Sequence, residues 1–264
     1  MKSLLGCKVV SNPNWRLAES YSYIFELAPQ EIAWEFLRRN PDYRLCVNGS
    51  DPSAEDDTDK LAKRWGLRFL ADPALNAMET SIFWLPEICA QTVILDAGVC
   101  ITSKNVTLSE DLLRQADIRN TIDGQHILLR KAGHTYQMFL TPRAQTTQQL
   151  HAVIPFDNYT TTRMMATSQL WVMLMKHKAP LICVNTQRRQ RLIQSLRALD
   201  AHLSGASHRQ IAQELFSPIR QEAESWRVSS MRGCVRRLVE TAITLMKQDY
   251  RDLLTQAPAK GGRK

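Results

Sequence analysis

The sequence lacks the short motifs that mark the common nucleotide-binding and hydrolase sites. It contains no G-x-x-x-x-G-K-[ST] loop, no G-x-G-x-x-G after a strand and no G-x-S-x-G elbow. Its six histidines are dispersed, and none forms a helical pair with a glutamate between. These absences argue against nucleotide-dependent, α/β-hydrolase and zinc chemistry, so we expect no catalytic residue, no bound metal and no cofactor.

Long apolar runs and closely spaced cysteines are also missing. The most apolar helical stretch, near Leu170 to Met175, is far below the ~20 residues needed to span a bilayer. The N-terminal MKSLLGCKVV is too short and too interrupted for a secretion signal. The six cysteines include no Cys-x-x-Cys pair, and several lie in apolar runs. We therefore expect reduced, buried cysteines in a cytoplasmic protein.

Positive charge is concentrated at one end of the chain. The 264 residues carry a net charge of +8. Residues 186–264 hold 15 lysines and arginines against 7 acidic residues, whereas residues 1–185 hold 19 of each. A basic module joined to a neutral body is typical of nucleic-acid binding, and less often of binding to an anionic membrane surface.

The basic end is predicted to form three helices between Thr186 and Tyr250. The first has its apolar residues at three- and four-residue spacing, namely Leu192, Ile193, Leu196, Leu199 and Leu203. Its arginines are expected on the other faces: Arg188, Arg189, Arg191 and Arg197. Gly205 ends this helix. The second starts at Ser207, which forms a capping box with Gln210, and buries Ile211, Leu215 and Phe216.

The third helix begins at Ser229 or Ser230, after a polar connector over residues 217–226. Its apolar face comprises Met231, Val235, Leu238, Val239, Ala242 and Met246. The opposite face comprises Ser229, Ser230, Gly233, Arg236, Arg237 and Glu240. Glycine on an exposed helical face costs about 1 kcal/mol relative to alanine, which suggests that another surface comes close there. This order predicts a helix-turn-helix; the alternative is a three-helix bundle with solvated arginines.

The first 66 residues are predicted to be helical. A helix from Gln30 to Arg39 begins near Pro29 and is stopped by Asn40-Pro41. Its bulky side comprises Trp34, Phe36 and Leu37, and its charged side Arg38 and Arg39. The acidic run DPSAEDDTDK predicts a helix capped by Ser53 and ending at Gly66, with carboxylates in its first turn that favour the helix dipole. The alternative, a divalent-metal loop, is disfavoured because the run lacks the glycine and distal glutamate of a calcium loop.

Residues 67–156 change to short runs of branched and aromatic residues, which predict strands. These runs are LRFL, SIFWLP, QTVILD, QHILLRK, HTYQMFL and LHAVIPF. A helix from Ser109 to Arg119 interrupts them, and the loop around Gly133 predicts a hairpin. A long helix follows from Asn158 to Lys178, and we expect it to pack on the sheet or on another subunit. Its apolar face is Met164, Met165, Leu170, Trp171, Leu174 and Met175.

The predicted fold class is α+β, with three domains. An N-terminal helical segment spans residues 1–66, and a mostly antiparallel sheet with the long helix spans 67–180. A C-terminal helix-turn-helix with a basic tail spans 181–264.

Several segments together match a known family. They are NWR…WEFLRRNPDYR, WGLRFLADP, DGQHILLR, QRRQRLIQSLRALDAHLSGASHRQIAQELF and SSMRGCVRRLVETA. Over Trp15 to about Leu254, the chain resembles the RovC-like proteobacterial transcriptional activators. The resemblance implies a bacterial activator that binds promoter DNA and contacts RNA polymerase. It also implies a higher homo-oligomer such as a hexamer. Some relatives keep only the C-terminal domain and act as antiactivators by binding an activator.

From these patterns we predict which residues contact double-stranded DNA. Arg236 and Ser230 are assigned to base edges, while Ser229 is assigned to the helix cap. Phosphate contacts are assigned to Arg188, Arg189, His208, Arg209, Arg232 and Arg237. The alternative function is an antiactivator or adaptor that binds another regulator. An RNA-binding protein or an enzyme would need Trp65, Trp84 and Tyr136 exposed, whereas we expect them buried.

Overall fold

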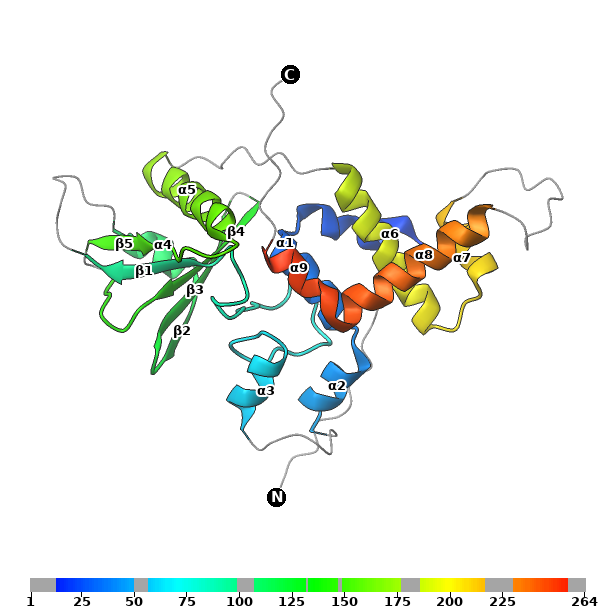
Figure 1. Cartoon of the computed structure of the whole chain (residues 1–264), viewed down its shortest axis with the longest axis horizontal. Helices are drawn as coiled ribbons and strands as arrows, with labels where there is room; N and C mark the ends of the chain where they lie inside the picture. Colours follow the sequence, from blue (N-terminus) through cyan, green and yellow to red (C-terminus); the bar gives the residue numbers. More distant parts are fainter. Residues whose placement is uncertain are drawn as a thin grey trace.

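A five-stranded sheet lies at one end of the long axis of the molecule, and the basic C-terminal helices lie at the other (Figure 1). This computed structural model describes residues 13–49, 57–98, 107–131, 133–146, 149–176, 186–216 and 230–255. It has the predicted α+β architecture: N-terminal helices, a central sheet and C-terminal helices.

The sheet is mixed and mainly antiparallel, with strand order β2-β3-β4-β1-β5. Its strands are β1 (Val93–Ala97), β2 (Asp117–Thr121), β3 (Gly124–Lys131), β4 (His134–Leu140) and β5 (Leu150–Val153). β1 pairs in parallel with β4, and the other pairs are antiparallel. The predicted hairpin around Gly133 is confirmed as β3–β4, and Gly133 has a φ of 73°, which favours glycine.

Three of the predictions for this region were wrong. The helix expected up to Arg119 is the short α4 (Glu110–Arg114), correctly capped by Ser109, and the edge strand β2 follows it. The runs LRFL and SIFWLP form no regular strands, only an isolated bridge between Leu67 and Trp84. The bridge does not extend into a strand pair. The side-chain amide of Gln137, on strand β4, donates to the backbone carbonyl of Trp84 at 2.5 Å.

The helix α5 (Thr160–Lys176) covers one face of the sheet (Figure 1). Its Ala166, Leu170 and Met173 enter the same buried cluster as sheet residues such as Ile127 and Met138. The predicted apolar face is only partly buried. Met164, Trp171 and Met175 are exposed.

The N-terminal segment contains η1 (Ala18–Glu26), α1 (Pro29–Leu37), α2 (Pro41–Val47) and α3 (Thr58–Arg64). α1 begins at Pro29 as predicted, but α2 was not predicted, although Asn40 caps it and Pro41 opens it. α3 is capped by Asp57; the predicted cap, Ser53, lies outside the described residues. Gly66 ends α3 as predicted, with a φ of 78°.

The C-terminal elements are α6 (Thr186–Leu203), α7 (His208–Leu215), α8 (Ser230–Thr244), the π-helical turn η2 (Leu245–Asp249) and α9 (Tyr250–Thr255). They share one hydrophobic core with the N-terminal segment. Trp34 and Tyr43 of the N-terminal segment lie in the same buried cluster as Leu199, Val235 and Tyr250. The two ends of the chain therefore form a single packing unit, separate from the core beneath α5.

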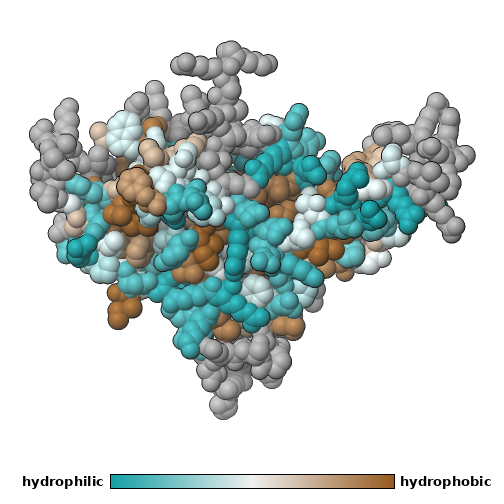
Figure 2. All heavy atoms as spheres, viewed as in Figure 1, coloured by the Kyte–Doolittle hydropathy of each residue, from teal (hydrophilic) through white to brown (hydrophobic). Residues whose placement is uncertain are grey.

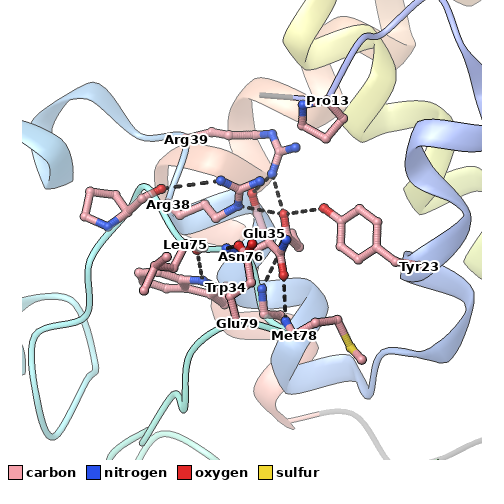
Figure 3. A network of polar contacts seen from close by, with 12 residues as sticks. Pro13, Tyr23, Trp34, Glu35, Arg38, Arg39, Leu75, Asn76, Met78 and Glu79 are labelled. Atoms are coloured by element: carbon pink, nitrogen blue, oxygen red, sulfur yellow. Dashed lines mark hydrogen bonds and ion pairs between the residues drawn. The ribbon is translucent and has the colours of Figure 1, made fainter. Parts of the chain in front are cut away.

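A buried charged network joins η1, α1 and α6. Arg39 contacts Asp200 of α6 at 2.8 Å and Glu35 at 2.7 Å, and Arg38 also contacts Glu35 at 2.7 Å. The hydroxyl of Tyr23 donates to Glu35 at 2.9 Å, so one carboxylate is bound by three side chains (Figure 3). The prediction that Arg38 and Arg39 form a charged outer side was wrong, because both are buried against these carboxylates.

Burial alone would lower the pKa of Arg39, but the facing carboxylates of Asp200 and Glu35 outweigh burial and raise it well above its usual value. Burial likewise raises the pKa of Glu35, and the cations of Arg39 and Arg38 reverse the effect and lower it. Arg39 and Glu35 are therefore both charged in the folded state.

α8, η2 and α9 form one unbroken helical run from Ser230 to Thr255, whose direction changes between α8 and α9 (Figure 1). Its last carbonyls have no intrahelical donors, and the body supplies them. The N–H of Ala90 donates to Leu254, the Gln91 amide to Leu253 and the Thr162 hydroxyl to Thr255. Within the π-helical turn, the Asn40 amide donates to the carbonyl of Met246 at 3.3 Å. The α9 end of this helical run is thus anchored in the body.

Candidate nucleic-acid interface

The turn between α6 and α7 has the tight geometry that the sequence predicts. Gly205 has a φ of 83°, and its N–H donates to the carbonyl of His202 at 2.9 Å. The N–H of Ala206 donates to Ala201 at 3.0 Å, which completes a Schellman motif. The predicted capping box of α7 is confirmed, because the Ser207 hydroxyl accepts from the N–H of Gln210 and the Gln210 side chain accepts from the N–H of Ser207.

The packing of α6 differs from the prediction at two positions. Ile193, Leu196 and Leu199 are buried as expected, but Leu203 is 42% exposed at the last turn. Arg197, predicted on an outer face, is buried, and its guanidinium donates to the carbonyl of Trp15 at 3.1 Å. The N-terminal segment covers this side of α6 and turns an apparent surface arginine into a structural one.

Arg188 and Arg189 begin α6 and lie at the end of the helix remote from α7. Arg188 is exposed. Arg189 is half-buried and donates through Nη1 to the carbonyls of Ile24, Phe25 and Leu27, at 3.1, 2.6 and 2.7 Å. Burial lowers the pKa of Arg189. Its guanidinium caps the end of η1.

α8 has one buried face and one exposed face, as predicted. Val235, Leu238, Val239 and Ala242 are buried, and Met246 continues this face into η2. Ser230, Arg232, Arg236 and Arg237 are exposed. Ser229 and the connector over residues 217–229 lie outside the described residues.

Arg236 of α8 is anchored weakly within the chain. Arg236 lies 3.6 Å from Glu240 in an ion pair whose side chains are 65% and 61% exposed. Such exposed pairs contribute only about 0.3–0.5 kcal/mol, so Arg236 can exchange this partner for another anion.

Gly233 lies on the same exposed face as Arg237. A Cβ atom at Gly233 would meet only the Nη1 of Arg237, at 3.9 Å. Nothing described in the fold therefore requires a glycine here, and the absence of a side chain leaves the backbone of α8 accessible to an external surface.

α7 contributes the remaining predicted contacts. Arg209 is exposed and His208 is half-buried at the start of α7. α6, α7 and α8 pack against one another in a common core, so the basic residues of α7 and α8 are carried by adjacent helices (Figure 1). Arg188 stands apart, because 15 residues of helix at about 1.5 Å each separate it from Leu203 at the other end of α6.

One basic residue of this surface, Lys247, was not predicted from the sequence. Lys247 is exposed in η2. Its position continues the three- and four-residue spacing of Arg237, Glu240 and Thr244, and that spacing could have identified it.

The aromatic side chains that an RNA-binding protein or an enzyme would need at its surface are buried. Trp65, Trp84 and Tyr136 are buried, as predicted, so they offer no stacking surface for bases. Within the described ranges, no group of three or more His, Cys, Asp or Glu side chains could hold a metal ion. Among the helices of the described residues, none is long and apolar enough to cross a membrane.

The cysteine prediction was partly wrong. Cys46 and Cys89 are buried, but Cys234 is exposed on α8. Cys7, Cys100 and Cys183 lie outside the described residues.

Comparison with known families gives two matches, one at each end of the chain. Residues 153–255 match the family described as T6SS transcription factor, DNA-binding domain. Residues 14–70 match the family described as proteobacterial transcriptional regulator-like domain. No curated protein matches the chain. The first match runs from the end of β5 through α9 and includes the exposed arginines of α8, and the second covers η1 to α3.

Proposed function

We propose that this chain, a RovC-like transcriptional regulator by its two matched domains, is an activator that binds promoter DNA through α8. The observation that carries the proposal is the exposed cluster Arg232, Arg236 and Arg237 on a helix whose other face is buried, within the matched DNA-binding domain.

In this mechanism the N-terminal turns of α8 enter the major groove. Arg236 exchanges Glu240 for a guanine, with which an arginine can form two parallel hydrogen bonds. Ser230 reaches a neighbouring base edge. Gly233, which presents no side chain, allows the helix to approach the groove wall closely.

The flanking cations hold the phosphates and set the register of the helix. On α8 and η2 these are Arg232, Arg237 and Lys247, and on α7 they are His208 and Arg209. Arg188 extends the phosphate contacts to the far end of α6. We assign Arg189 to the fold rather than to DNA, because it already donates to three carbonyls at the end of η1.

The activator acts as a homo-oligomer, with a hexamer as the expected assembly, and contacts RNA polymerase from the promoter. The basic faces carry most of the net charge and would repel one another, which favours assembly through the neutral body.

The test is binding to a promoter fragment from the neighbourhood of its own gene and to a scrambled duplex, over a series of salt concentrations. Arg236→Ala is expected to cost about 1–3 kcal/mol on the promoter and less on the scrambled duplex. Arg143→Ala is the matched control, because Arg143 is 81% exposed in the body and pairs with Asp96. Equal loss on both duplexes would make Arg236 a phosphate contact.

Arg188→Ala and Arg189→Ala separate a phosphate contact from a structural one. Arg188→Ala should weaken binding to both duplexes alike and reduce the salt slope by about one unit. Arg189→Ala should lower the stability of the fold. If the wild-type protein binds neither duplex at low salt, the alternative function, an adaptor that binds another regulator, replaces this proposal.

A further inference from the structure

The exposed face of α8 carries one negative charge among its positive charges. Glu240 is the only acidic residue from Ser230 to Thr244, a helix that contains three arginines. Its side chain is 61% exposed. Hydrophilic side chains are exposed along the α8 side of the molecule (Figure 2). A carboxylate on this surface repels a phosphate backbone, so it weakens any interface that contacts phosphates alone.

Glu240 lies in the middle of the exposed face. At 100° per residue, it lies within about 20° of Gly233 and between the directions of Arg236 and Arg237. Along the helix axis it is about 10 Å from Gly233 and about 6 Å from Arg236. A helix in the major groove turns the middle of its exposed face towards the base edges. The position of Glu240 is therefore that of a residue that meets bases.

The pair with Arg236 leaves the carboxylate able to accept hydrogen bonds. Nε of Arg236 and Oε1 of Glu240 are 3.6 Å apart, which is beyond hydrogen-bond distance. The neighbouring hydroxyls of Thr241 and Thr244 donate to carbonyls of their own helix, at 2.8 and 2.9 Å. When Arg236 exchanges Glu240 for a guanine, the carboxylate also loses this nearby cation.

The chemistry of the carboxylate selects one base. An ionised carboxylate accepts hydrogen bonds and donates none, so it matches a base edge that presents a donor alone. In the major groove, cytosine presents only its N4 amino group, whereas adenine places the N7 acceptor beside its amino group. Guanine presents two acceptors, which a carboxylate would repel.

We infer that Glu240 determines specificity by accepting a hydrogen bond from the N4 amino group of a cytosine, within about two base pairs of the guanine bound by Arg236. The inference rests on the proposed function and adds a second base to the site. The carboxylate weakens binding to all DNA through repulsion, and only a site with this cytosine compensates for it.

The test is selection of binding sites by the full chain from a library of randomised duplexes. The wild-type protein should select a guanine and a cytosine one or two steps apart. Glu240→Ala should keep the guanine and lose the cytosine, while Arg236→Ala should lose the guanine. The ratio of affinities for the selected duplex and a scrambled duplex should fall about tenfold in Glu240→Ala.

The two affinities should change in opposite directions. Glu240→Ala should bind the selected duplex more weakly and the scrambled duplex about two- to fivefold more tightly, because a negative charge leaves the interface. The matched control is Glu110→Ala. Glu110 is 86% exposed on α4 and forms the same kind of pair with Arg114, four residues on, at 3.2 Å. Its removal should change neither affinity.

A conservative variant tests the chemistry at this position. Glu240→Gln keeps the size of the side chain but adds an amide donor, which suits the N6 and N7 atoms of adenine. The base selected at this position should therefore change from cytosine to adenine. Both variants should unfold at the wild-type temperature, because the pair with Arg236 is exposed and weak.

Three results would overturn the inference. Glu240→Ala could select the same sequence as the wild type, or bind all duplexes more tightly by the same factor. It could also lose only the guanine that Arg236→Ala loses, in which case Glu240 merely positions Arg236. In each case the wild-type protein still selects a sequence, so the proposed function stands. A wild-type protein that selects no sequence would contradict the proposed function, and this inference with it.

Discussion

Arg39 shows how a single residue connects the two ends of the sequence. Its guanidinium donates two hydrogen bonds to Asp200, which lies 161 positions along the chain, and contacts Glu35 four positions away. The pair is almost fully buried, with side chains 0% and 2% exposed. A buried ion pair contributes little net stability, but breaking it leaves an uncompensated charge.

Asp200→Ala should therefore destabilise the protein by about 3–5 kcal/mol. Urea unfolding at neutral pH measures this, with Asp252→Ala as the control, since Asp252 is an exposed carboxylate of the same unit. The double variant Arg39→Met, Asp200→Leu should lose less than Asp200→Ala, because it removes both charges. A loss below about 1 kcal/mol for Asp200→Ala would contradict the role of the network.

His126 is a second buried residue with a measurable consequence. It lies on β3 between the rings of Phe69 and Phe139, with centroid distances of 5.7 and 4.8 Å. Burial first, and then the cation of Arg68, lower its pKa to about 4, while Asp123 opposes them. Neither ring nitrogen has a hydrogen-bond partner in the described structure.

The imidazole is therefore neutral when folded but binds a proton below about pH 6.5 when unfolded. Its contribution to stability is complete above pH 6.5 and is lost as the pH falls towards 4. Between pH 7 and pH 5, the wild-type protein should lose about 1–2 kcal/mol more than His126→Phe, which keeps a ring at this position. Urea midpoints at the two pH values measure the difference; equal losses would show that His126 does not titrate in this way.

At the residue scale, the helical periodicity of the sequence does not predict which arginines are exposed to solvent. Arg38, Arg39, Arg189 and Arg197 all occupy helical positions that read as charged surface. Arg38 and Arg39 pair with the nearby Glu35, but each of the four also binds a carboxylate or carbonyl distant in sequence, as Arg197 binds the carbonyl of Trp15. Hydrophobic periodicity describes one helix at a time, so it cannot predict that another segment of the chain buries a given side chain.

At the element scale, local signals succeeded where the chain itself supplies the cause. The capping box of Ser207 and Gln210 and the positive φ of Gly205 follow from neighbouring residues, and both were predicted. β2 was missed because its sequence, DIRNT, has little strand propensity, and pairing with β3 holds it in the sheet. At Trp84 the prediction failed for a different reason, because the Gln137 side chain binds both its backbone N–H and its carbonyl.

Gly233 supports the sharpest prediction for α8. A Cβ atom meets nothing closer than 3.9 Å within the chain, so Gly233→Ala should stabilise the protein by about 0.5–1 kcal/mol. The same methyl group should weaken promoter binding, on the order of tenfold, if the groove wall approaches the helix here. Urea unfolding and promoter binding of the Gly233→Ala protein, measured on the same sample, test both expectations. Higher stability with unchanged affinity would show that DNA does not approach Gly233.

At the scale of the whole molecule, the N-terminal segment and the helices α6 to α9 form one folded unit. Leu196, Leu199 and Val235 are fully buried in a cluster that also contains Trp34 and Phe36. From the sequence we predicted separate domains for residues 1–66 and 181–264, and this division remains a prediction. Tryptophan-rich and leucine-rich segments each predict a buried face, but composition alone does not say that the two faces meet.

A truncated chain tests this shared core. Residues 186–264 alone should expose the apolar faces of α6 and α8 and should unfold without a cooperative transition, because about 25 cal/mol per Å² of buried apolar surface is lost. Circular dichroism during thermal unfolding measures this, with the full chain as the control. A fragment that unfolds cooperatively and binds the promoter as tightly as the full chain would show that the C-terminal helices fold and bind DNA without the N-terminal segment.

The central claim is that the outer face of α8 lies on DNA, and site-directed photocrosslinking tests it most directly. A photoreactive phenylalanine analogue is placed at position 240, an exposed position of α8, and, in a second protein, at the exposed position 78 on another surface. With the promoter duplex bound, we expect the analogue at position 240 to crosslink to DNA and the one at position 78 not to do so. Bound DNA that never crosslinks to position 240 would contradict the claim.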